Sequence, residues 1–248
     1  MTQLIAFGNQ KGGVGKTTLT LNAAGALLYR GFRIAIIDAD PQQSIIKFNV
    51  MPGEENRSWA YRREENGLPP FPSPIHLVAD HKGEVHSEIR RLLKSGRLGD
   101  PDFVLVDMPP RLEAVQTTST LQIADLVVVP HEMTPSSIGP TYEFIALLRE
   151  YAMKKNSALK FCTVPNMIDA RTNNTKELFE QHDDLLKHAV AIISRRDAFV
   201  TADRLGCTVH DLPKGTALMA IREIDDMVNK ILFVLGKNAA KEKEKVTA

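Results

Sequence analysis

A glycine-rich stretch near the N-terminus constrains the fold of this chain more than any other feature. Residues 8–18 read GNQKGGVGKTT, and they lie between a short apolar run at 4–7 and a helix-forming stretch at 18–29. A buried strand, a glycine-rich turn and a helix, in that order, direct backbone N–H groups toward an anion at the helix N-terminus. The sequence therefore predicts a phosphate-binding loop after the first strand of an α/β fold.

The end of this loop, Gly15-Lys16-Thr17, has the residue types that close phosphate-binding loops. Lys16 is expected to contact the β- and γ-phosphate oxygens, and Thr17 to bind Mg²⁺ through its hydroxyl group. The glycines let the backbone approach the phosphates closely. The residues expected to bind the nucleotide here are Gly12, Gly13, Val14, Gly15, Lys16, Thr17 and Thr18.

A second lysine, Lys11, stands near the start of the loop. One lysine at the end of such a loop is enough to reach the β- and γ-phosphates. The second lysine therefore places an additional positive charge where another subunit can contact it. The alternative is an ordinary solvated lysine on a loop, and we favour the functional interpretation because of its place in the motif.

Nearly continuous apolar runs recur along the chain and alternate with helical stretches. Such runs are typical of parallel strands that are covered on both faces. This alternation predicts an α/β fold with a doubly wound, mainly parallel sheet, helices on both faces and ligands at the carboxyl ends of the strands. The expected strands are residues 4–7, 34–37, 75–79, 103–106, 126–129, 159–164 and 190–193, and the expected helices are 17–29, 85–98, 113–123, 140–155 and 176–188.

The length and composition fit one large domain. The 248 residues are 43% hydrophobic, which is enough to bury a full core. We expect a single nucleotide-binding domain over residues 1–236 and a polar, disordered tail over 237–248. A segment rich in proline and charge, residues 51–74, interrupts the alternation and is expected to be a long loop.

Charge and cysteine content narrow the possible partners and location. The formal net charge is +1, so any contact with nucleic acid has to come from a local patch of charge. The two cysteines, Cys162 and Cys207, form no pairing motif, which suits a reducing cytoplasm. The chain begins directly at the first strand, so we expect no signal peptide. No apolar run approaches the ~20 residues that cross a bilayer.

Two further segments place carboxylates at the same edge of the predicted sheet. Asp38 and Asp40 follow the second strand and precede a proline, and Asp107 ends the strand at 103–106. In phosphate-loop enzymes such carboxylates hold Mg²⁺ or orient the water that attacks the γ-phosphate. An Asx turn would also explain Asp38 and Asp40. Beside a phosphate loop we favour the functional role.

Three segments together, KGGVGKTT, DADPQQS and VLVDMPP, resemble the motifs of the ParA/MinD family of deviant Walker-A ATPases. The similarity is greatest to short ParA-type partition ATPases without an N-terminal DNA-reading domain, because the chain begins just before its first strand. Weaker similarities to the family lie at residues 124–130, 166–173, 193–206 and 214–215.

The resemblance implies a homodimer in which two subunits sandwich two ATP molecules. Lys11 of each subunit would reach the phosphates bound by the other, and Gly12 would permit the close approach of the subunits. Asp40 would position or activate the attacking water. The resemblance thus implies catalytic roles for Lys11, Lys16 and Asp40, a Mg²⁺ site at Thr17, Asp38 and Asp107, and contact of Asn166 with adenine.

The resemblance also implies further partners. The ATP-bound dimer would bind DNA without sequence preference, and a ParB-like cargo adaptor would stimulate a Mg²⁺-dependent hydrolysis that is weak in the protein alone. Such a protein is cytoplasmic and nucleoid-associated, and it partitions or positions a plasmid, a chromosome or another cargo. Between residues 195 and 237, seven basic residues accompany six acidic ones, so the fold has to gather the basic ones on one face. The candidates for DNA contact are Arg195, Arg196, Lys214 and Arg222.

Two alternatives belong to other functional classes. A MinD-like ATPase at a membrane surface would use an amphipathic C-terminal helix, and residues 227–237 hold enough apolar residues for one. We expect those residues to pack in the core instead, and we expect no membrane partner. An ATPase with an iron–sulfur cluster between its subunits would need cysteines beside the three motifs, and neither Cys162 nor Cys207 lies there.

Overall fold

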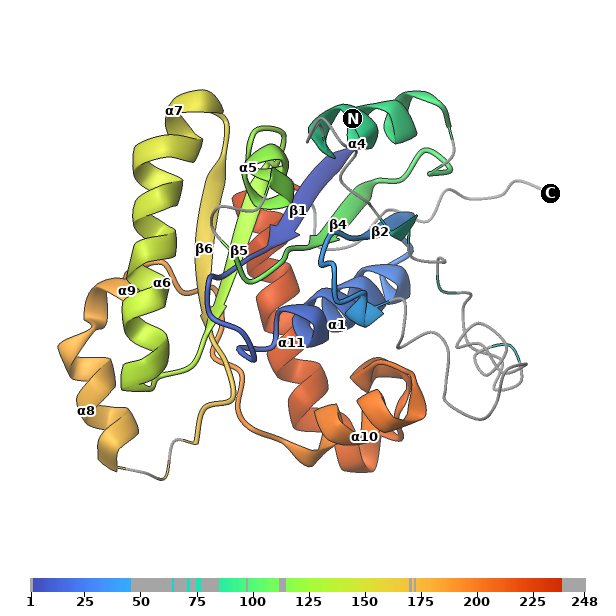
Figure 1. Ribbon diagram of the computed structural model, residues 1–248. Helices are drawn as coiled ribbons and strands as arrows, with labels where there is room; N and C mark the ends of the chain where they lie inside the picture. The colour runs from blue at the N-terminus through green and yellow to red at the C-terminus, as the bar shows by residue number, and fades with distance from the viewer. Residues whose placement is uncertain are drawn as a thin grey trace.

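The computed structural model has a central parallel sheet with helices on both faces (Figure 1). The structure describes residues 2–45, 64, 71, 75–76, 85–96, 98–111, 115–169, 171 and 173–237. Most of the predicted loop at 51–74, the second half of the predicted strand at 75–79, and residues 238–248 of the predicted tail lie outside these described residues.

Six strands form the sheet, and every pair of neighbours is parallel. Their order across the sheet is β3-β2-β4-β1-β5-β6, so the chain begins in the interior of the sheet and builds outward in both directions. This topology confirms the predicted doubly wound parallel fold. The strands are β1 (Gln3–Phe7), β2 (Ile34–Asp38), β3 (Ile75–His76), β4 (Phe103–Asp107), β5 (Leu126–His131) and β6 (Lys160–Pro165).

Helices connect the strands and cover the sheet. The long last helix, α11, lies against α1 on one face of the sheet. The helices are α1 (Lys16–Tyr29), α4 (Val85–Lys94), α5 (Val115–Leu121), α6 (Pro135–Leu147), α7 (Met153–Lys155), α8 (Asn173–Gln181), α9 (Asp183–Lys187), α10 (Asp197–Leu205) and α11 (Lys214–Val234), with a π-helical turn at Leu148–Ala152 and a 3₁₀ turn at Val209–Asp211.

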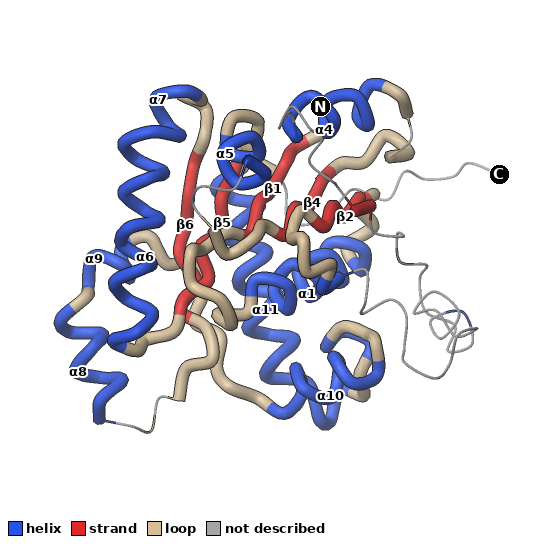
Figure 2. The backbone as a smooth tube through the Cα atoms, viewed as in Figure 1, coloured by secondary structure: helices blue, strands red, loops and turns tan. Residues whose placement is uncertain are grey.

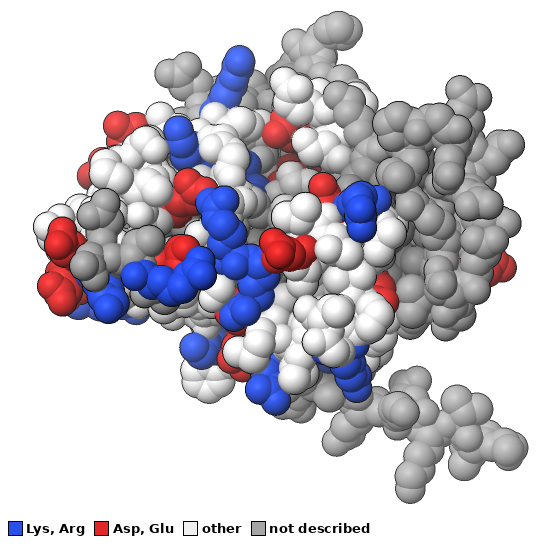
Figure 3. All heavy atoms as spheres, turned by 90° about the horizontal axis from the view of Figure 1, so that it is seen from below, with Lys and Arg blue, Asp and Glu red and all other residues white. Residues whose placement is uncertain are grey.

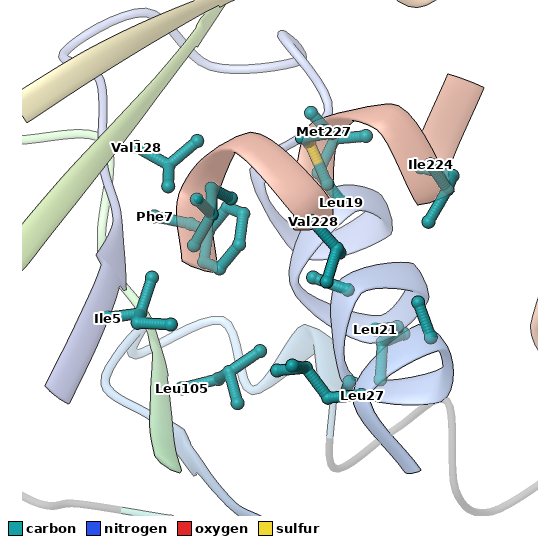
Figure 4. Packing of buried hydrophobic residues seen from close by; sticks show 14 of the residues in the cluster. Ile5, Phe7, Leu19, Leu21, Leu27, Leu105, Val128, Ile224, Met227 and Val228 are labelled. Atoms are coloured by element: carbon teal, nitrogen blue, oxygen red, sulfur yellow. The ribbon is translucent and has the colours of Figure 1, made fainter. Parts of the chain in front are cut away.

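Alternate residues of β1, β2, β4, β5 and β6 direct their side chains to opposite faces of the sheet. Ile5 and Phe7 of β1 belong to the core beneath α1 and α11, whereas Leu4 and Ala6 belong to the core beneath α4, α5 and α6. Figure 4 shows the first core, with Phe7 turned toward side chains of α1 and α11. Because both faces are covered, the strands are apolar along most of their length, which explains the continuous runs in the sequence.

The predicted seventh strand, residues 190–193, is not a strand. Isolated bridges flank this segment: Ala189 pairs with Thr163 of β6, and Ser194 pairs with Ile168, which follows β6. Val190 N–H donates to Thr163 O, and the next bond joins Ile193 N–H to Pro165 O. Between these two hydrogen bonds, the segment advances by three residues, from 190 to 193, while β6 advances by two, from 163 to 165. The extra residue resembles a β-bulge, and it interrupts the ladder of hydrogen bonds.

Two helix predictions also need correction. The helix expected at 140–155 begins at Pro135, because a proline fits the first position of a helix, where no N–H partner is needed. The helix expected at 176–188 is divided into α8 and α9 by His182, whose φ of −127° lies outside the helical region. The short helix α10 was not among the predicted helices.

Candidate nucleotide-binding site

The glycine-rich loop joins β1 to α1 at the carboxyl ends of the strands, beside the segments that follow β2 and β4 (Figure 2). Gly15 precedes α1 in the left-handed region, with φ at 86°. A β-carbon at Gly15 would lie 2.2 Å from Nδ2 of Asn166. Glycine is therefore required here both by the backbone angle and by the close approach of Asn166. The first N–H groups of α1 remain available for an anion.

Lys16 begins α1 and has a buried side chain, with 6% of the residue exposed. Its ammonium donates a hydrogen bond to the backbone oxygen of Lys11 at 3.3 Å, so it lies inside the loop. Burial lowers the pKa of Lys16, while the carboxylates of Asp107 and Asp40 oppose that shift. A buried cation at the start of a helix, facing two acidic groups, is suited to holding phosphate oxygens.

Thr17 and Asp107 form the most direct link between the loop and β4. The Thr17 hydroxyl donates to Oδ2 of Asp107 at 2.6 Å. Asp107 is fully buried, and burial raises its pKa to about 7, with Asp38 and Asp40 adding to the shift and the Thr17 hydrogen bond and Lys16 opposing it. Within the described part of the chain, Oδ1 of Asp107 is buried and has no hydrogen-bond partner.

These two side chains fit a Mg²⁺ ion. Magnesium prefers oxygen ligands, and it is usually held by one or two protein groups together with phosphates and water. Thr17 supplies a hydroxyl oxygen, and Asp107 supplies a buried carboxylate oxygen that lacks a partner among the described residues. Among those residues no group of three or more His, Cys, Asp or Glu side chains is placed to hold a metal.

Asp38 lies beside Asp107 because the parallel register of β2 and β4 pairs the two residues. Its carboxylate accepts N–H groups from Asp40 at 3.1 Å and from Ile45 at 3.0 Å. Asp40 in turn accepts the N–H of Gln42 at 2.9 Å. Both aspartates thus form Asx turns, the alternative interpretation of these residues in the sequence. Asp38 also holds the segment after β2 through these hydrogen bonds. Asp40 keeps its side chain at the same edge, where it interacts with Lys16.

Asn166 follows β6 and supports the loop from the other side. Its side-chain Nδ2 donates to the backbone oxygen of Val14 at 2.9 Å, and its N–H donates to His131 O. A pocket of about 270 Å³ opens beside Asn166 and Thr18 and extends to Arg196. The structure therefore places Asn166 between the phosphate loop and this pocket, and its amide holds the loop.

Lys11 has a half-buried position at the start of the loop. Its backbone is held on both sides, because its N–H donates to Asn9 Oδ1 and its oxygen accepts from Lys16 Nζ. In the described part of the chain, the Lys11 ammonium forms no ion pair with a carboxylate. Gly12 has open space around it, with no atom within 4 Å of where a β-carbon would stand.

Asn9 is a residue of the site that the sequence reasoning missed. Only 1% of it is exposed, and its Nδ2 donates to Pro130 O at 2.8 Å and to Thr141 Oγ1 at 2.9 Å. Its Oδ1 accepts the N–H of Lys11 at 3.0 Å. The signal in the sequence was a polar residue directly between an apolar strand and the glycines, where a buried amide can satisfy the first turn of the loop.

The four candidates for DNA contact lie around α10 and α11, but in different environments. Arg195 has 70% of its side chain exposed, whereas Arg196 is 29% exposed and pairs with Glu223 at 2.7 Å. Lys214 and Arg222 are exposed on α11. On the lower face of the molecule, groups of Lys and Arg side chains alternate with acidic ones (Figure 3). The basic residues are thus gathered only in part.

The chain is similar in sequence to a family of nucleotide-binding proteins and to several of its members. The family model described as "CobQ/CobB/MinD/ParA nucleotide binding domain" matches residues 5–246. The "Maintenance of carboxysome distribution protein A" of Halothiobacillus neapolitanus is 28% identical over 232 residues, which cover 92% of this chain and 95% of that protein. The "Sporulation initiation inhibitor protein Soj" of Bacillus subtilis is 27% identical over 201 residues, covering 73% of this chain and 79% of that protein.

Solved structures agree on the fold. A putative plasmid partition protein of Borrelia burgdorferi, crystallised with AMPPNP, superposes with a TM-score of 0.66 at 17% identity, covering 94% of this chain and 99% of that one. None of the described helices is long and apolar enough to cross a membrane. With the family model matching nearly the whole chain and the loop, the carboxylates and the sheet in place, this protein belongs to the ParA/MinD family of nucleotide-binding ATPases.

Proposed function

We propose that this protein is an ATPase that dimerises when it binds ATP, and that its dimer binds DNA nonspecifically to partition or position a cargo. The observation that carries the proposal is the loop itself. It joins a buried Lys16 and a Thr17–Asp107 pair to a second lysine, Lys11, whose ammonium has no carboxylate partner among the described residues. The names of similar proteins, which concern carboxysome distribution and plasmid partition, support the partition role.

Different residues of the site bind different parts of ATP and its cofactor. Lys16 and the N–H groups at the start of α1 hold the β- and γ-phosphates. Thr17 and Asp107 would hold Mg²⁺, which would neutralise the negative charge that develops on the phosphates. Asp40 holds the attacking water, since its carboxylate lies at the same edge of the sheet as Lys16. Asp38 keeps Asp40 in place through the turn between them.

Lys11 acts on the nucleotide of the partner subunit. A cation supplied by a second subunit stabilises the negative charge that spreads over the phosphoryl oxygens in the transition state, as an arginine finger does. The same contact stabilises the dimer only while the γ-phosphate is present. The lifetime of the dimer is therefore tied to hydrolysis, and a partner protein that accelerates hydrolysis also ends the dimer.

The pocket beside Thr18 and Asn166 takes the rest of the nucleotide. The phosphates occupy the loop at residues 12–17, and this pocket begins where the loop enters α1. The base and sugar then lie between Asn166 and the segment that leads to α10, with Phe199 and Val200 as apolar surface for the base.

The apolar residues on which the membrane alternative depends are mostly in the core. Met227, Val228, Ile231 and Leu232 of α11 are each at most 2% exposed, and among the large apolar residues of this stretch only Phe233 is strongly exposed, at 83%. A membrane-binding helix needs a continuous apolar face that is free of the core. We therefore propose DNA, and no membrane, as the surface on which the dimer acts.

Light scattering and DNA binding test this proposal. We expect a monomer without nucleotide or with ADP, a dimer with ATP, and retention of a DNA fragment of arbitrary sequence only with ATP. Lys11→Ala should bind ATP within about threefold of the wild-type affinity but stay monomeric, because the lost contact is made only between subunits. Lys155→Ala, on exposed α7, is the matched control and should behave as wild type.

Two results would contradict the proposal in separate ways. An ATP-induced dimer of unchanged stability in Lys11→Ala removes the role of Lys11 in the partner's site. DNA binding that is equal with ATP, with ADP and without nucleotide removes the nucleotide switch, even if ATP is hydrolysed.

A further inference from the structure

One carboxylate ties the segment before α10 to the middle of α11. Glu223 accepts the N–H of Ser194 at 3.1 Å and the Ser194 hydroxyl at 2.8 Å. It also accepts two hydrogen bonds from the guanidinium of Arg196, at 3.1 Å from Nε and 2.7 Å from Nη2. Both oxygens of Glu223 are thus used twice, and the pairing with Arg196 is bidentate, which is the strong form of this interaction.

This cluster is only partly open to solvent. The side chain of Glu223 is 15% exposed and that of Arg196 is 29% exposed. The hydrogen bonds to Glu223 raise the pKa of Arg196. Screening by water is weaker for such a half-buried pair than for an exposed one, so the contact fixes the Arg196 side chain in one orientation.

The residues that Glu223 holds form a wall of the proposed nucleotide pocket. Ser194, Arg195 and Arg196 line the pocket of about 270 Å³, together with Thr18 and Asn166. The backbone of the same segment is held on its other side, because Ile168 donates to Ile193 O and Arg195 donates to Ile168 O. The wall therefore depends on two supports, the segment that follows β6 through the backbone of Ile168 and α11 through Glu223.

Arg196 was a candidate for DNA contact, and its geometry suggests a different task. A guanidinium that already makes two hydrogen bonds to a carboxylate has fewer donors left for a phosphate. To contact DNA, Arg196 would also have to break its bidentate pair with Glu223, which costs free energy. Arg195, with 70% of its side chain exposed and its nearest carboxylate, Glu132, at 3.9 Å, is freer to contact an external partner.

We propose that Glu223 is a positioning residue for the base end of the nucleotide site: acting through Ser194 and Arg196, it sets the affinity for the nucleoside and the preference between bases. This inference rests on the proposed function, since it takes the pocket beside Thr18 as the place of the base. It also makes α11 part of the site, because a displacement of Glu223 moves the wall.

Glu223→Gln tests the proposal, because glutamine keeps the shape but loses the charge and has only one accepting oxygen in the amide. We expect KM for ATP to rise by about tenfold and kcat at saturation to stay within about twofold of wild type. The inhibition constant of inorganic tripolyphosphate should not change, because that probe occupies only the loop. The ratio of ATP to GTP affinity should fall.

Matched variants separate positioning from loss of stability. Asp226→Asn removes an exposed carboxylate one turn further along α11, beside the same outer groove as Glu223, and should leave ATP affinity unchanged. Arg196→Gln should weaken ATP binding by itself, and adding Glu223→Gln should cause little further loss, since the two residues act as one unit. Ser194→Ala, which removes one hydroxyl bond, should raise KM for ATP by about two- to threefold.

Three outcomes overturn the inference. The first is wild-type ATP affinity in a folded Glu223→Gln protein. The second is an equal loss of ATP and tripolyphosphate binding, which indicates general destabilisation of the fold. The third applies if Glu223→Gln does not fold. Unchanged ATP affinity and unchanged base preference in both Ser194→Ala and Arg196→Gln then overturn the inference. Failure of the wild type to bind ATP would instead overturn the proposed function.

Discussion

Asn9 joins three parts of the site through a single buried amide. Its two donors reach Pro130 at the end of β5 and Thr141 in α6, and its oxygen holds the N–H of Lys11. A buried amide with all of these bonds satisfied is rigid, and removing it leaves several polar groups without partners. The place of Lys11 is therefore set by the sheet and by α6 as well as by the glycines.

Replacing Asn9 should separate ATP binding from dimer formation. Asn9→Ala is expected to lower the free energy of unfolding by about 1–3 kcal/mol, because it leaves the Lys11 N–H and the Pro130 oxygen unsatisfied. ATP affinity, measured by calorimetry, should fall less than the fraction of ATP-induced dimer, measured by light scattering. Thr141→Val, which removes one partner of Asn9 but keeps the bond to Lys11, should retain the dimer. Equal dimer formation in Asn9→Ala and wild type contradicts this expectation.

The sequence alone could identify the residues whose type is diagnostic, and it could not identify those whose role depends on a distant partner. Lys16 and Thr17 could be predicted because the loop motif assigns their chemistry. Arg196 could not, because its partner, Glu223, lies 27 positions away and only the fold brings them together. The roles of the site residues, Lys16, Thr17 and Asp40 among them, and of the DNA-contact candidates stay predictions.

At the scale of elements, the junction between the loop and α1 is the most constrained place in the structure. Gly15→Ala should impair folding and nucleotide binding, because φ at this position is 86° and a β-carbon would lie 2.2 Å from Asn166. The left-handed conformation alone costs an alanine about 1–2 kcal/mol. Thermal unfolding and ATP titration measure the two effects.

Gly12→Ala is the matched control for this change. No atom lies within 4 Å of the added carbon, and Gly12 has no positive φ. The monomer should therefore unfold at the wild-type temperature. Equal stability of the two variants would mean that Asn166 and the loop move aside at little cost.

The end of β5 makes the stability of the fold dependent on pH. His131 is fully buried, and burial lowers its pKa to about 4. The unfolded chain takes up a proton on this histidine below pH ~6.5, while the folded protein does not until pH ~4, so the fold loses up to about 3 kcal/mol across that window. Denaturant unfolding at several pH values measures this loss.

His131→Leu should remove that contribution. The difference in unfolding free energy between wild type and variant should change steadily from pH 6.5 to pH 4 and stay constant above pH 7. A difference that does not vary with pH would show that His131 is protonated equally in the folded and unfolded states.

The elements that were mispredicted share a physical cause. Residues 190–193 have the apolar composition of a strand. Their pairing with β6 is interrupted because this segment has one residue more than β6 between two successive hydrogen bonds. Residues 197–205 form a helix although they lie beyond the last of the expected strands and helices. Composition indicates which residues are buried, but pairing and capping decide the element, and both depend on neighbours that are distant in sequence.

For the whole molecule, binding of ATP and folding should be linked. A ligand that binds only the folded state at 100 times its dissociation constant stabilises that state by about 2.7 kcal/mol. We therefore expect ATP with Mg²⁺ to raise the unfolding temperature, and EDTA to reduce the gain, because Thr17 and Asp107 then lose the ion that they would share with the phosphates. Lys16→Ala should show no gain, and an equal gain in that variant contradicts the assignment of the loop.

The architecture was predictable because its signals repeat along the chain. A parallel sheet covered on both faces requires apolar runs separated by helices, and each run and helix supports the same conclusion. The order of the strands was not predictable from these runs, since every run is equally apolar. The order matters, because it places β4 between β1 and β2 and so brings Asp107 beside both Thr17 and Asp38.

The pairing of Asp38 with Asp107 limits the positions at which residues can be inserted into this protein or deleted from it. Side chains alternate between the faces of a sheet, so inserting or deleting one residue within β2 or β4 would turn one of these carboxylates to the opposite face. The segment at residues 98–101, before β4, lies at the opposite edge of the sheet and carries no such restriction. Functional descendants of this chain should therefore vary in length at that edge and keep the number of residues in these strands unchanged.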